Sequence, residues 1–361
     1  MTNANTYAQH WLTDHPLVDG RVVLNLGGFR IAVRSNSTAV LEKLGVYFAH
    51  TLDVGDADIE VVAIETPALE LDLNWLDWAR EPGKTGRKDA YVDVMDGRLV
   101  KKIRTGMVFL QSAGQRFAVG PCLQNDNQVI NFINAQYMTW LQHNRALMCH
   151  ASGLVVDGRC VAMAGFSGGG KSTLMLHMLG EDGVRYLTND RLFLDREMET
   201  VRARGIAKLP RINPGTIVHN DALKAMLSPA REAELLALPQ TELWHLEEKY
   251  DVDIEALYGP DKIQTQADLA AFLILNWRPG GDQGCQIEPI DLAARPELLE
   301  RAIMKSPGPF YQLEDGGFFQ DTTALDRAAY LHMLADVPIF EVTGRVDFAH
   351  AARFCLNQVR G

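Results

Sequence analysis

A glycine-rich stretch in the middle of the chain, Gly165-Phe-Ser-Gly-Gly-Gly170-Lys171-Ser172, constrains the fold more than any other feature of the sequence. It matches the pattern G-x-x-x-x-G-K-[ST], which is typical of a phosphate-binding loop (P-loop) between a β-strand and an α-helix. Both neighbours are present, because residues 159–164 form a β-type run and residues 172–179 are mostly apolar and end at Gly180. The sequence therefore predicts strand, loop and helix in this order, rather than a glycine-rich turn that matches the pattern by chance.

Such a loop binds a nucleotide because its glycines let backbone N–H groups converge on phosphate at the positive end of a helix dipole. Lys171 would add a point charge to the β- and γ-phosphates of ATP, and the Ser172 hydroxyl would ligate Mg²⁺. As a loop charge, Lys171 is expected to be exposed rather than part of a core. The residues expected to bind ATP are Gly165, Ser167, Gly168, Gly169, Gly170, Lys171, Ser172 and Thr173.

Charge, hydropathy and cysteine usage exclude several classes of protein. The 361 residues include 35 basic and 46 acidic ones, a net charge of −11, and such a surface repels nucleic acid. The longest apolar runs are far shorter than the roughly 20 residues that cross a membrane, and residues 1–15 carry no signal-peptide pattern. The five cysteines are scattered without metal-ligand spacing, so we expect free thiols in a soluble, cytoplasmic protein.

The length suggests two domains, at roughly 150 residues per domain. Residues 1–145 predict an α+β domain. A β-hairpin turns at Gly27-Gly28, a helix begins near Ser35–Ser37, a β-meander spans residues 90–111, and a long amphipathic helix follows over residues 129–141. Residues 146–361 contain the glycine-rich loop and end in a strand and an amphipathic helix. We expect an α/β fold, α+β overall, with a mixed sheet in this second, nucleotide-binding domain.

Residues around the loop resemble a known superfamily. Cys149-His150-Ala151-Ser152-Gly153 opens a strand pair that turns at Asp157-Gly158, and Thr188-Asn189-Asp190-Arg191 follows the loop helix. This order is similar to the kinase core of the HPr kinase/phosphorylase superfamily, which is related to the nucleotide-binding fold of phosphoenolpyruvate carboxykinase. The resemblance is strong over residues 148–194. It implies a P-loop kinase domain, ATP and Mg²⁺ as cofactors, and a homo-oligomer.

One departure from that superfamily concerns its paired aspartates. Where HPr kinases carry Asp-Asp, this chain has Asn189-Asp190, so one carboxylate of the pair is missing. Asp190 is expected to be a metal ligand, directly or through water, or the base that accepts the proton of the acceptor hydroxyl. Its alternative role is a cap or turn carboxylate at a strand end. Asn189 would orient groups rather than take a proton.

Basic residues beyond the loop are candidates for the acceptor side. Arg204, Lys208 and Arg211 lie beside two prolines in an otherwise acidic chain and are expected to clamp the transferring phosphoryl group or an anionic acceptor. The alternative is a solvated turn. The family's Glu-x-Arg-Gly-type signature is only partly present at Arg204-Gly205, which argues against the phosphorylase activity and against HPr as the substrate.

Three further residues have two interpretations each. The resemblance implies that His150 lies beside the nucleotide phosphates and the acceptor, whereas a single histidine is often structural. Arg278 and Lys305 either reach the site from the edge of the sheet or are surface residues.

The sequence thus predicts a kinase with Asp190, His150, Lys171, Arg211 and Lys208 as catalytic residues and Ser172 and Asp190 as metal ligands. The expected reaction transfers the γ-phosphoryl group of ATP to a hydroxyl of a small polar acceptor, such as a sugar, a polyol or a hydroxy amino acid. Two alternatives remain: a protein kinase that acts on a serine of a partner, and a nucleotide-binding switch with little transfer activity.

Overall fold

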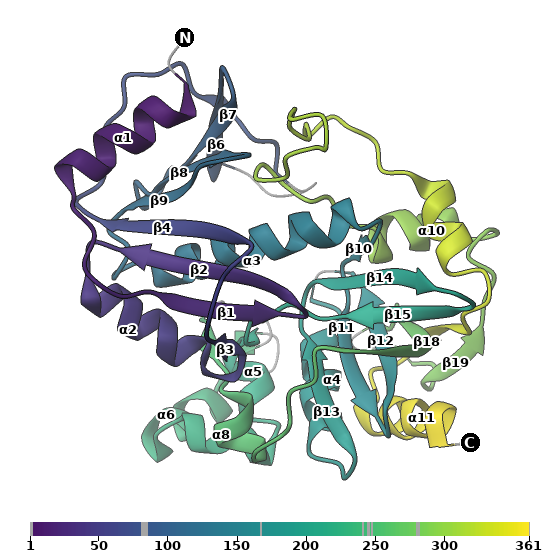
Figure 1. Ribbon diagram of the computed structural model, residues 1–361. Coiled ribbons are helices and arrows are strands. Elements are labelled where there is room, and N and C mark those ends of the chain that lie inside the picture. The colour runs from purple at the N-terminus through teal and green to yellow at the C-terminus, as the bar shows by residue number, and fades with distance from the viewer. Residues whose placement is uncertain are drawn as a thin grey trace. The chain divides into compact units, whose positions relative to one another are not determined.

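Two nine-stranded mixed sheets dominate the part of the chain that the structure describes, and helices flank both of them (Figure 1). The computed structural model describes residues 3–80, 86–166, 168–239, 242–243, 246, 248–278 and 282–360. Each sheet is the centre of one unit. The first unit comprises Met1–Arg145 and Ser306–Ala324, and the second comprises Ala146–Lys305 and Leu325–Gly361. The fold is therefore mixed α/β, with a large mixed sheet in each unit.

The first sheet contains a parallel centre between antiparallel flanks. β2 pairs with β4 and β4 with β9 in parallel, while the other neighbours are antiparallel. Its strands, in order across the sheet, are β3 (Leu52–Asp53), β1 (Val22–Leu26), β2 (Phe29–Ser35), β4 (Ile59–Glu65), β9 (Arg116–Gly120), β8 (Val108–Ser112), β7 (Gly97–Lys102), β6 (Asp89–Val94) and β5 (Leu76–Asp77). The predicted hairpin at Gly27-Gly28 is confirmed, since Leu26 pairs with Phe29.

Helices cover both faces of this sheet, as the alternation of its side chains requires. They are α1 (Ala4–Asp14), α2 (Thr38–Tyr47), the 3₁₀ turn η1 (Ala49–Thr51) and α3 (Asp126–His143). On one face Trp11 of α1 lies 5.8 Å from the Phe117 ring. On the other, Phe132 of α3 lies 5.1 Å from Phe109. The Ser37 hydroxyl caps α2, as its sequence predicts.

Residues 306–324 belong to the first unit, whereas the sequence-based division assigned them to the second domain. The Phe310 ring packs 5.4 Å from Phe109 and 5.2 Å from Phe132. The Arg98 side chain is completely buried, and its guanidinium donates to the carbonyl oxygens of Pro309 (3.3 Å) and Phe319 (2.9 Å). These contacts are long-range and leave no periodic pattern in the sequence, which explains why the pattern alone did not place the segment.

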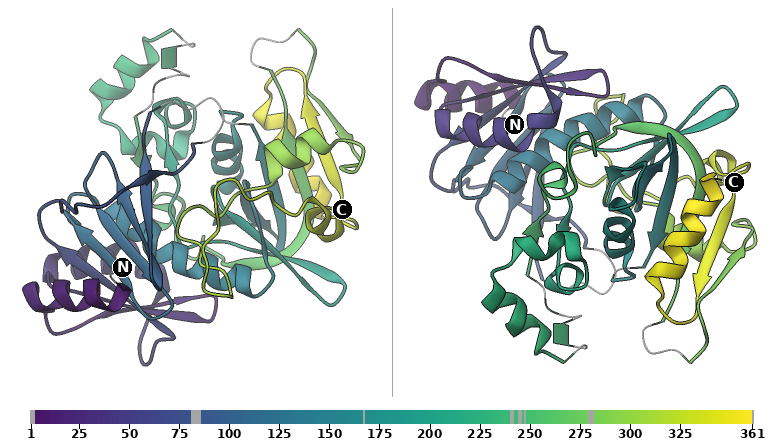
Figure 2. Two further views of the ribbon diagram at one scale, coloured as in Figure 1. Left: turned by 90° about the horizontal axis from the view of Figure 1, so that it is seen from above. Right: turned by 90° about the horizontal axis from the view of Figure 1, so that it is seen from below.

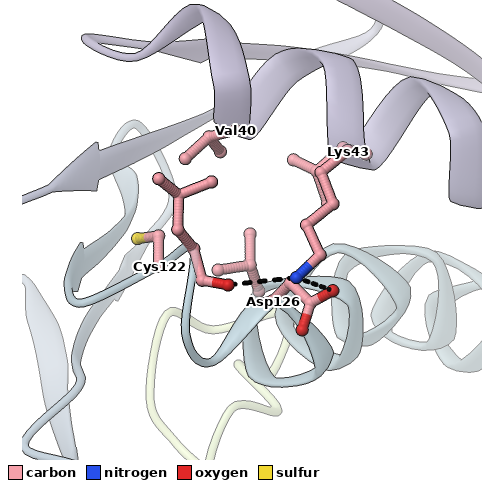
Figure 3. Close-up of a pocket in the computed structure, with 7 residues that line it drawn as sticks. Val40, Lys43, Cys122 and Asp126 are labelled. Atoms are coloured by element: carbon pink, nitrogen blue, oxygen red, sulfur yellow. Dashed lines mark hydrogen bonds and ion pairs between the residues drawn. The ribbon is translucent and has the colours of Figure 1, made fainter.

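A small notch lies between α2 and the start of α3 (Figure 3). The Lys43 ammonium spans it, 3.0 Å from a carboxylate oxygen of Asp126 and 3.1 Å from the carbonyl oxygen of Leu123. Val40 and Cys122 line the opposite side, and the empty space is about 160 Å³ including open solvent. Its cation is already paired, so this notch offers no ligand-binding chemistry of its own.

The second sheet has three parallel strands at its centre. β18 pairs in parallel with β12 on one side and with β20 on the other. The main path is β10 (Leu147–Cys149), β14 (Leu192–Glu197), β15 (Thr200–Arg204), β18 (Gln266–Leu275), β12 (Arg159–Gly165), β11 (Ser152–Val156) and β13 (Val184–Thr188), joined at β18 by β20 (Ile339–Thr343) and β19 (Gln286–Pro289). A separate pair is formed by β16 (Arg211–Ile212) and β17 (Tyr250–Asp251).

Two hydrophobic clusters sandwich this sheet. Val161 and Met163 of β12 face a cluster that includes α4 and α11, whereas Cys160 and Ala162 face the cluster around residues 298–303. Figure 2 shows α11 against β18, as the contacts require. The helical elements of the second unit are α4 (Lys171–Leu179), α5 (Pro214–Ile217), the 3₁₀ turn η2 (Asp221–Met226), α6 (Pro229–Leu236), α8 (Ile254–Tyr258), α9 (Pro296–Leu298), the π-helical turn η3 (Leu299–Ile303), α10 (Arg327–Met333) and α11 (Phe348–Arg360).

Two sequence expectations can be compared directly with this architecture. All five cysteines lie among the described residues, and each is a free thiol, as predicted. In the described part of the chain, no helix combines the length and the apolar character needed to cross a membrane.

The burial of Arg98 leads to a prediction about the stability of the first unit. Arg98→Met keeps much of the side-chain volume but leaves the carbonyl oxygens of Pro309 and Phe319 without their donor. We expect the free energy of unfolding to fall by about 1–3 kcal/mol and hydrogen exchange of residues 306–324 to accelerate. Urea unfolding and exchange mass spectrometry measure both. Arg87→Met removes an exposed pair with Asp77 and is the control. Equal exchange of residues 306–324 in Arg98→Met and the wild type would contradict this role.

Candidate functional site

The glycine-rich loop connects the end of β12 to the start of α4. Gly165 has φ +146°, and a Cβ there would lie 2.6 Å from the carbonyl oxygen of Leu275. Gly170, at the N-cap of α4, is left-handed with φ +82°. Both positions therefore require glycine. No side chain caps α4 among the described residues, so its first backbone N–H groups are donors for an incoming anion. Ser167 lies outside the described residues.

A tryptophan after the neighbouring strand braces the loop. The indole N–H of Trp277 donates to the carbonyl oxygen of Gly169 at 2.8 Å. The ring is buried and meets Phe348 edge-on, with 5.0 Å between centroids. Because Trp277 follows β18, which runs parallel to β12, its ring reaches the loop from the same edge of the sheet. This contact between distant segments leaves no pattern in the sequence.

Lys171 is the first residue of α4 and is buried, with 9% of its surface exposed. The expectation of an exposed loop charge is therefore wrong. Its ammonium folds back on the loop and donates to the carbonyl oxygen of Gly165 at 2.8 Å. Ser172 occupies the next position of the helix. The Thr173 hydroxyl, also expected to bind nucleotide, lies 2.8 Å from the Thr216 hydroxyl on α5.

Strand register brings the His150 and Asn189-Asp190 segments to the edge of the sheet that carries the loop. Gly153 of β11 pairs with Ala162 on one side and with Thr188 on the other. β12 and β13 both run antiparallel to β11, so they end at the same edge. The residues after Thr188 therefore lie level with the end of β12. His150, two residues before β11, belongs to this edge too.

His150 and Asp190 form a hydrogen-bonded pair there. His150 Nε2 lies 3.1 Å from one carboxylate oxygen of Asp190, and Arg191 pairs with the other oxygen. The backbone N–H of His150 donates to the carbonyl oxygen of Ile303 at 2.7 Å, which fixes the start of the segment. Asn189 and Asp190 lie in a bend between β13 and β14. In the described part of the chain, the Asn189 side-chain oxygen is buried without a hydrogen-bond partner.

Both members of the pair are held in their ordinary neutral-pH forms by a positive environment. For Asp190, burial acts to raise the pKa, but the charges of Arg191 and Lys305 and the His150 hydrogen bond outweigh it, so the pKa lies well below its usual range. For His150, the hydrogen bond to Asp190 acts to raise the pKa, but burial and the charges of Lys171 and Lys305 lower it overall. Asp190 is therefore an anion and His150 a neutral imidazole near pH 7.

The three residues of the predicted basic clamp, Arg204, Lys208 and Arg211, have different surroundings in the structure. Arg204 pairs with Asp195 and donates to Gln266, so it is engaged within the sheet. Arg211 lies 2.9 Å from a carboxylate oxygen of Asp251. Lys208 lies close enough to Asp190, Arg191 and Arg211 for their charges to shift its pKa, which burial and the two arginines lower overall. The structure thus places the charge of Lys208 within reach of Asp190, and Arg211 with its carboxylate partner within reach of Lys208.

The π-helical turn η3 and the residues that follow it form another wall of this edge. The backbone N–H of Lys305 donates to the carbonyl oxygen of Met148 at 3.2 Å, and its charge acts on both His150 and Asp190. The Arg301 guanidinium lies 5.4 Å from the centre of the Phe166 ring in the loop. Arg301 was missed because an isolated arginine in a short turn carries no motif. Arg278 is exposed, and its backbone N–H donates to the carbonyl oxygen of Gly344.

The donor set fits magnesium better than a metal held by protein alone. Among the described residues, no three His, Cys, Asp or Glu side chains gather as a metal cluster. Magnesium in nucleotide sites is usually held by one or two carboxylates together with substrate phosphates and waters. Asp190, the Ser172 hydroxyl and the unpartnered Asn189 oxygen are oxygen donors of that kind.

Comparisons with known proteins identify structural similarity but no family. No family model matches this chain, and no curated protein matches it. Among solved structures, the HPr(Ser) kinase/phosphatase from Coxiella burnetii is similar over 59% of this chain and 93% of that chain, with 14% sequence identity and a TM-score of 0.27. A TM-score of this size does not establish a shared fold, so we interpret the site from its own geometry.

The hydrogen bond from Trp277 to the glycine-rich loop leads to a prediction about the binding of MgATP. Trp277→Phe keeps a ring against Phe348 but removes the donor to Gly169, so the loop loses one fixing hydrogen bond. We expect the affinity for MgATP to fall about two- to tenfold, the effect of one net hydrogen bond. Isothermal titration calorimetry measures it. Trp75→Phe, in the first unit, is the control, and equal affinities of Trp277→Phe and the wild type would show that the hydrogen bond does not shape the loop.

Proposed function

We propose that this protein is a Mg²⁺-dependent phosphotransferase that transfers the γ-phosphoryl group of ATP to a hydroxyl of a small polar acceptor. The observation that carries the proposal is a convergence within one unit. The glycine-rich loop, with the uncapped start of α4, and the His150–Asp190 pair lie at the same edge of one sheet. A phosphate-binding element beside an acid–base pair is what transfer to a hydroxyl needs.

The loop side supports nucleotide binding. The first N–H groups of α4 have no side-chain cap among the described residues, and Lys171 supplies a buried positive charge. Phosphoryl transfer requires mainly positioning and neutralisation of charge, and both are properties of this arrangement. Bound Mg²⁺ would neutralise charge on the phosphates, with Ser172 and Asp190 as its protein ligands and Asn189 as a further oxygen donor.

The His150–Asp190 pair supports proton transfer from the acceptor. A carboxylate whose pKa lies well below the usual range is a weak base, so Asp190 is better suited to bind a cation and to orient the imidazole. With Nε2 directed at Asp190, the Nδ1 nitrogen of neutral His150 is the acceptor for a hydroxyl proton. This assigns the role of base to His150. The pKa of its imidazole lies closer to the operating pH than the pKa of Asp190, which the sequence predicted as the base or a metal ligand.

A transfer screen with labelled ATP tests the proposal. Sugars, polyols, serine and HPr-like proteins are offered to the full-length protein with Mg²⁺. A labelled small molecule is the expected result, and Lys171→Met should abolish it, with circular dichroism as the check on folding. A labelled protein would instead identify a protein kinase, and release of phosphate alone would identify a nucleotide-binding switch.

Substitution of the pair should separate the roles of its members. We expect Asp190→Asn and His150→Gln each to lower turnover at least about a hundredfold, the lower range for loss of an acid–base group or of its partner. Asp336→Asn, which removes an exposed carboxylate of the same unit, is the control. Retention of most of the activity in both site variants would mean that another group takes the proton.

The pH profile follows from the direction of the His150 shift. Its pKa lies below the ordinary 6.5, so neutral imidazole persists until the pH falls below that value. We therefore expect kcat/KM to be flat from about pH 8 to 6.5 and to decline below it, and the decline should disappear in the residual activity of His150→Gln. Rate measurements across this range test it. A decline that begins well above pH 6.5 in the wild type would conflict with the assignment.

A further inference from the structure

We propose that the hydroxyl acceptor is an anion, an alcohol that carries a carboxylate or phosphate group, and that the Lys208 ammonium binds its negative charge. This inference rests on the proposed phosphoryl transfer and names the class of acceptor for the same site. Neutral sugars and polyols are then not the preferred substrates.

The backbone around Lys208 is fixed next to the edge that carries Asp190. The Tyr186 hydroxyl donates to the carbonyl oxygen of Lys208 at 2.6 Å, and the backbone N–H of Lys208 donates to Ile206 at 2.7 Å. Gly205 passes so close to β13 that a Cβ there would lie 2.0 Å from the carbonyl oxygen of Leu187. Tyr186 and Leu187 lie just before Asn189-Asp190 in the chain. Lys208 is therefore held at the site by contacts of its own backbone.

Among the described residues, the Lys208 ammonium differs from three nearby arginines in having no partner. Arg191 pairs with Asp190, Arg211 with Asp251, and Arg204 with Asp195. Within the described ranges, the Lys208 ammonium makes no hydrogen bond and no ion pair, although the residue is half-buried. A partly buried ammonium without a counter-charge is costly, and an anionic ligand removes that cost.

More cations than carboxylates act on the His150–Asp190 pair and on Lys208. The cations come from the loop helix, the bend after β13, the segment before β16, β16 itself and the residue after η3, and the carboxylates come from that bend and from β17. The cations are Lys171, Arg191, Lys208, Arg211 and Lys305, and the carboxylates are Asp190 and Asp251. These cations gather in a chain whose net charge is −11.

These cations attract a negatively charged acceptor as well as the phosphates of the nucleotide. The structure favours Lys208 for this contact because, in the part of the chain that the structure describes, its ammonium has no hydrogen-bond or ion-pair partner while its charge interacts with that of Asp190.

Three small alcohols with similar hydroxyl groups test the inference: glycerol, glycerate and glycerol 3-phosphate. We expect calorimetry on the full-length protein to show binding of the two anions and at least tenfold weaker binding of glycerol. Lys208→Gln should weaken binding of glycerate about tenfold or more, the effect of losing one hydrogen bond to a charged group. Lys224→Gln, which removes an exposed lysine paired with Asp221, should change nothing. Lys171→Met removes the lysine of the glycine-rich loop. Anion binding that persists in this variant is therefore binding at Lys208 and not binding of phosphate by the loop.

The outcomes of this binding test can be distinguished from the outcomes of the test of the proposed phosphotransferase. Glycerol that binds as tightly as glycerate, or glycerate binding that is unchanged in Lys208→Gln, would overturn the anionic acceptor even if ATP is hydrolysed or transferred. Selective, Lys208-dependent binding of glycerate supports the anion site whether or not transfer is observed. Failure of MgATP to bind at all, measured separately, would overturn the phosphotransferase alone.

Discussion

The antiparallel pairing of β11 with both β12 and β13 is the constraint on which the whole candidate site depends. It makes β12 and β13 end at one edge, so that the glycine-rich loop and the Asn189-Asp190 bend meet there. The same pairing places the start of β11, and therefore His150, at that edge. A slip of one residue in this register would turn the side chains of β11 to the opposite faces and separate the groups. Hydrophobic packing on both faces of the sheet opposes such a slip.

Asp190 is the only carboxylate in the Asn189-Asp190 bend, and the neutrality of Asn189 shapes the electrostatics around it. One oxygen of Asp190 contacts His150 and the other contacts Arg191, so the carboxylate is shared between a neutral imidazole and a guanidinium. A second carboxylate at position 189 would cancel one of the surrounding positive charges. With Asn189 in its place, the edge keeps a net positive potential. Asn189 thus leaves uncancelled the positive charge that an aspartate at this position would offset.

Short-range features could be predicted from the sequence, and long-range contacts could not. The Gly27-Gly28 hairpin and the strand–loop–helix order around Lys171 depend on local propensities. The first helix was missed, although Ala4, Ala8 and Trp11 lie at helical spacing, because polar residues dominate it. The burial of Lys171, the Trp277 contact and the position of Arg301 depend on which segments meet in space. The sequence left Asp190 as a metal ligand or as the base, because it shows the carboxylate but not the cations that lower the pKa of that carboxylate.

The path of residues 306–324 has a consequence for how this chain can be divided. The backbone passes between the units three times, after Arg145, after Lys305 and after Ala324. Neither unit is a continuous stretch of the gene, so a fragment that begins at residue 146 carries Phe310 and Phe318 without the aromatic rings and the guanidinium that contact them. The excised insertion would then be an apolar loop in water. An autonomous second unit requires that this loop be replaced by a short polar linker between Lys305 and Leu325.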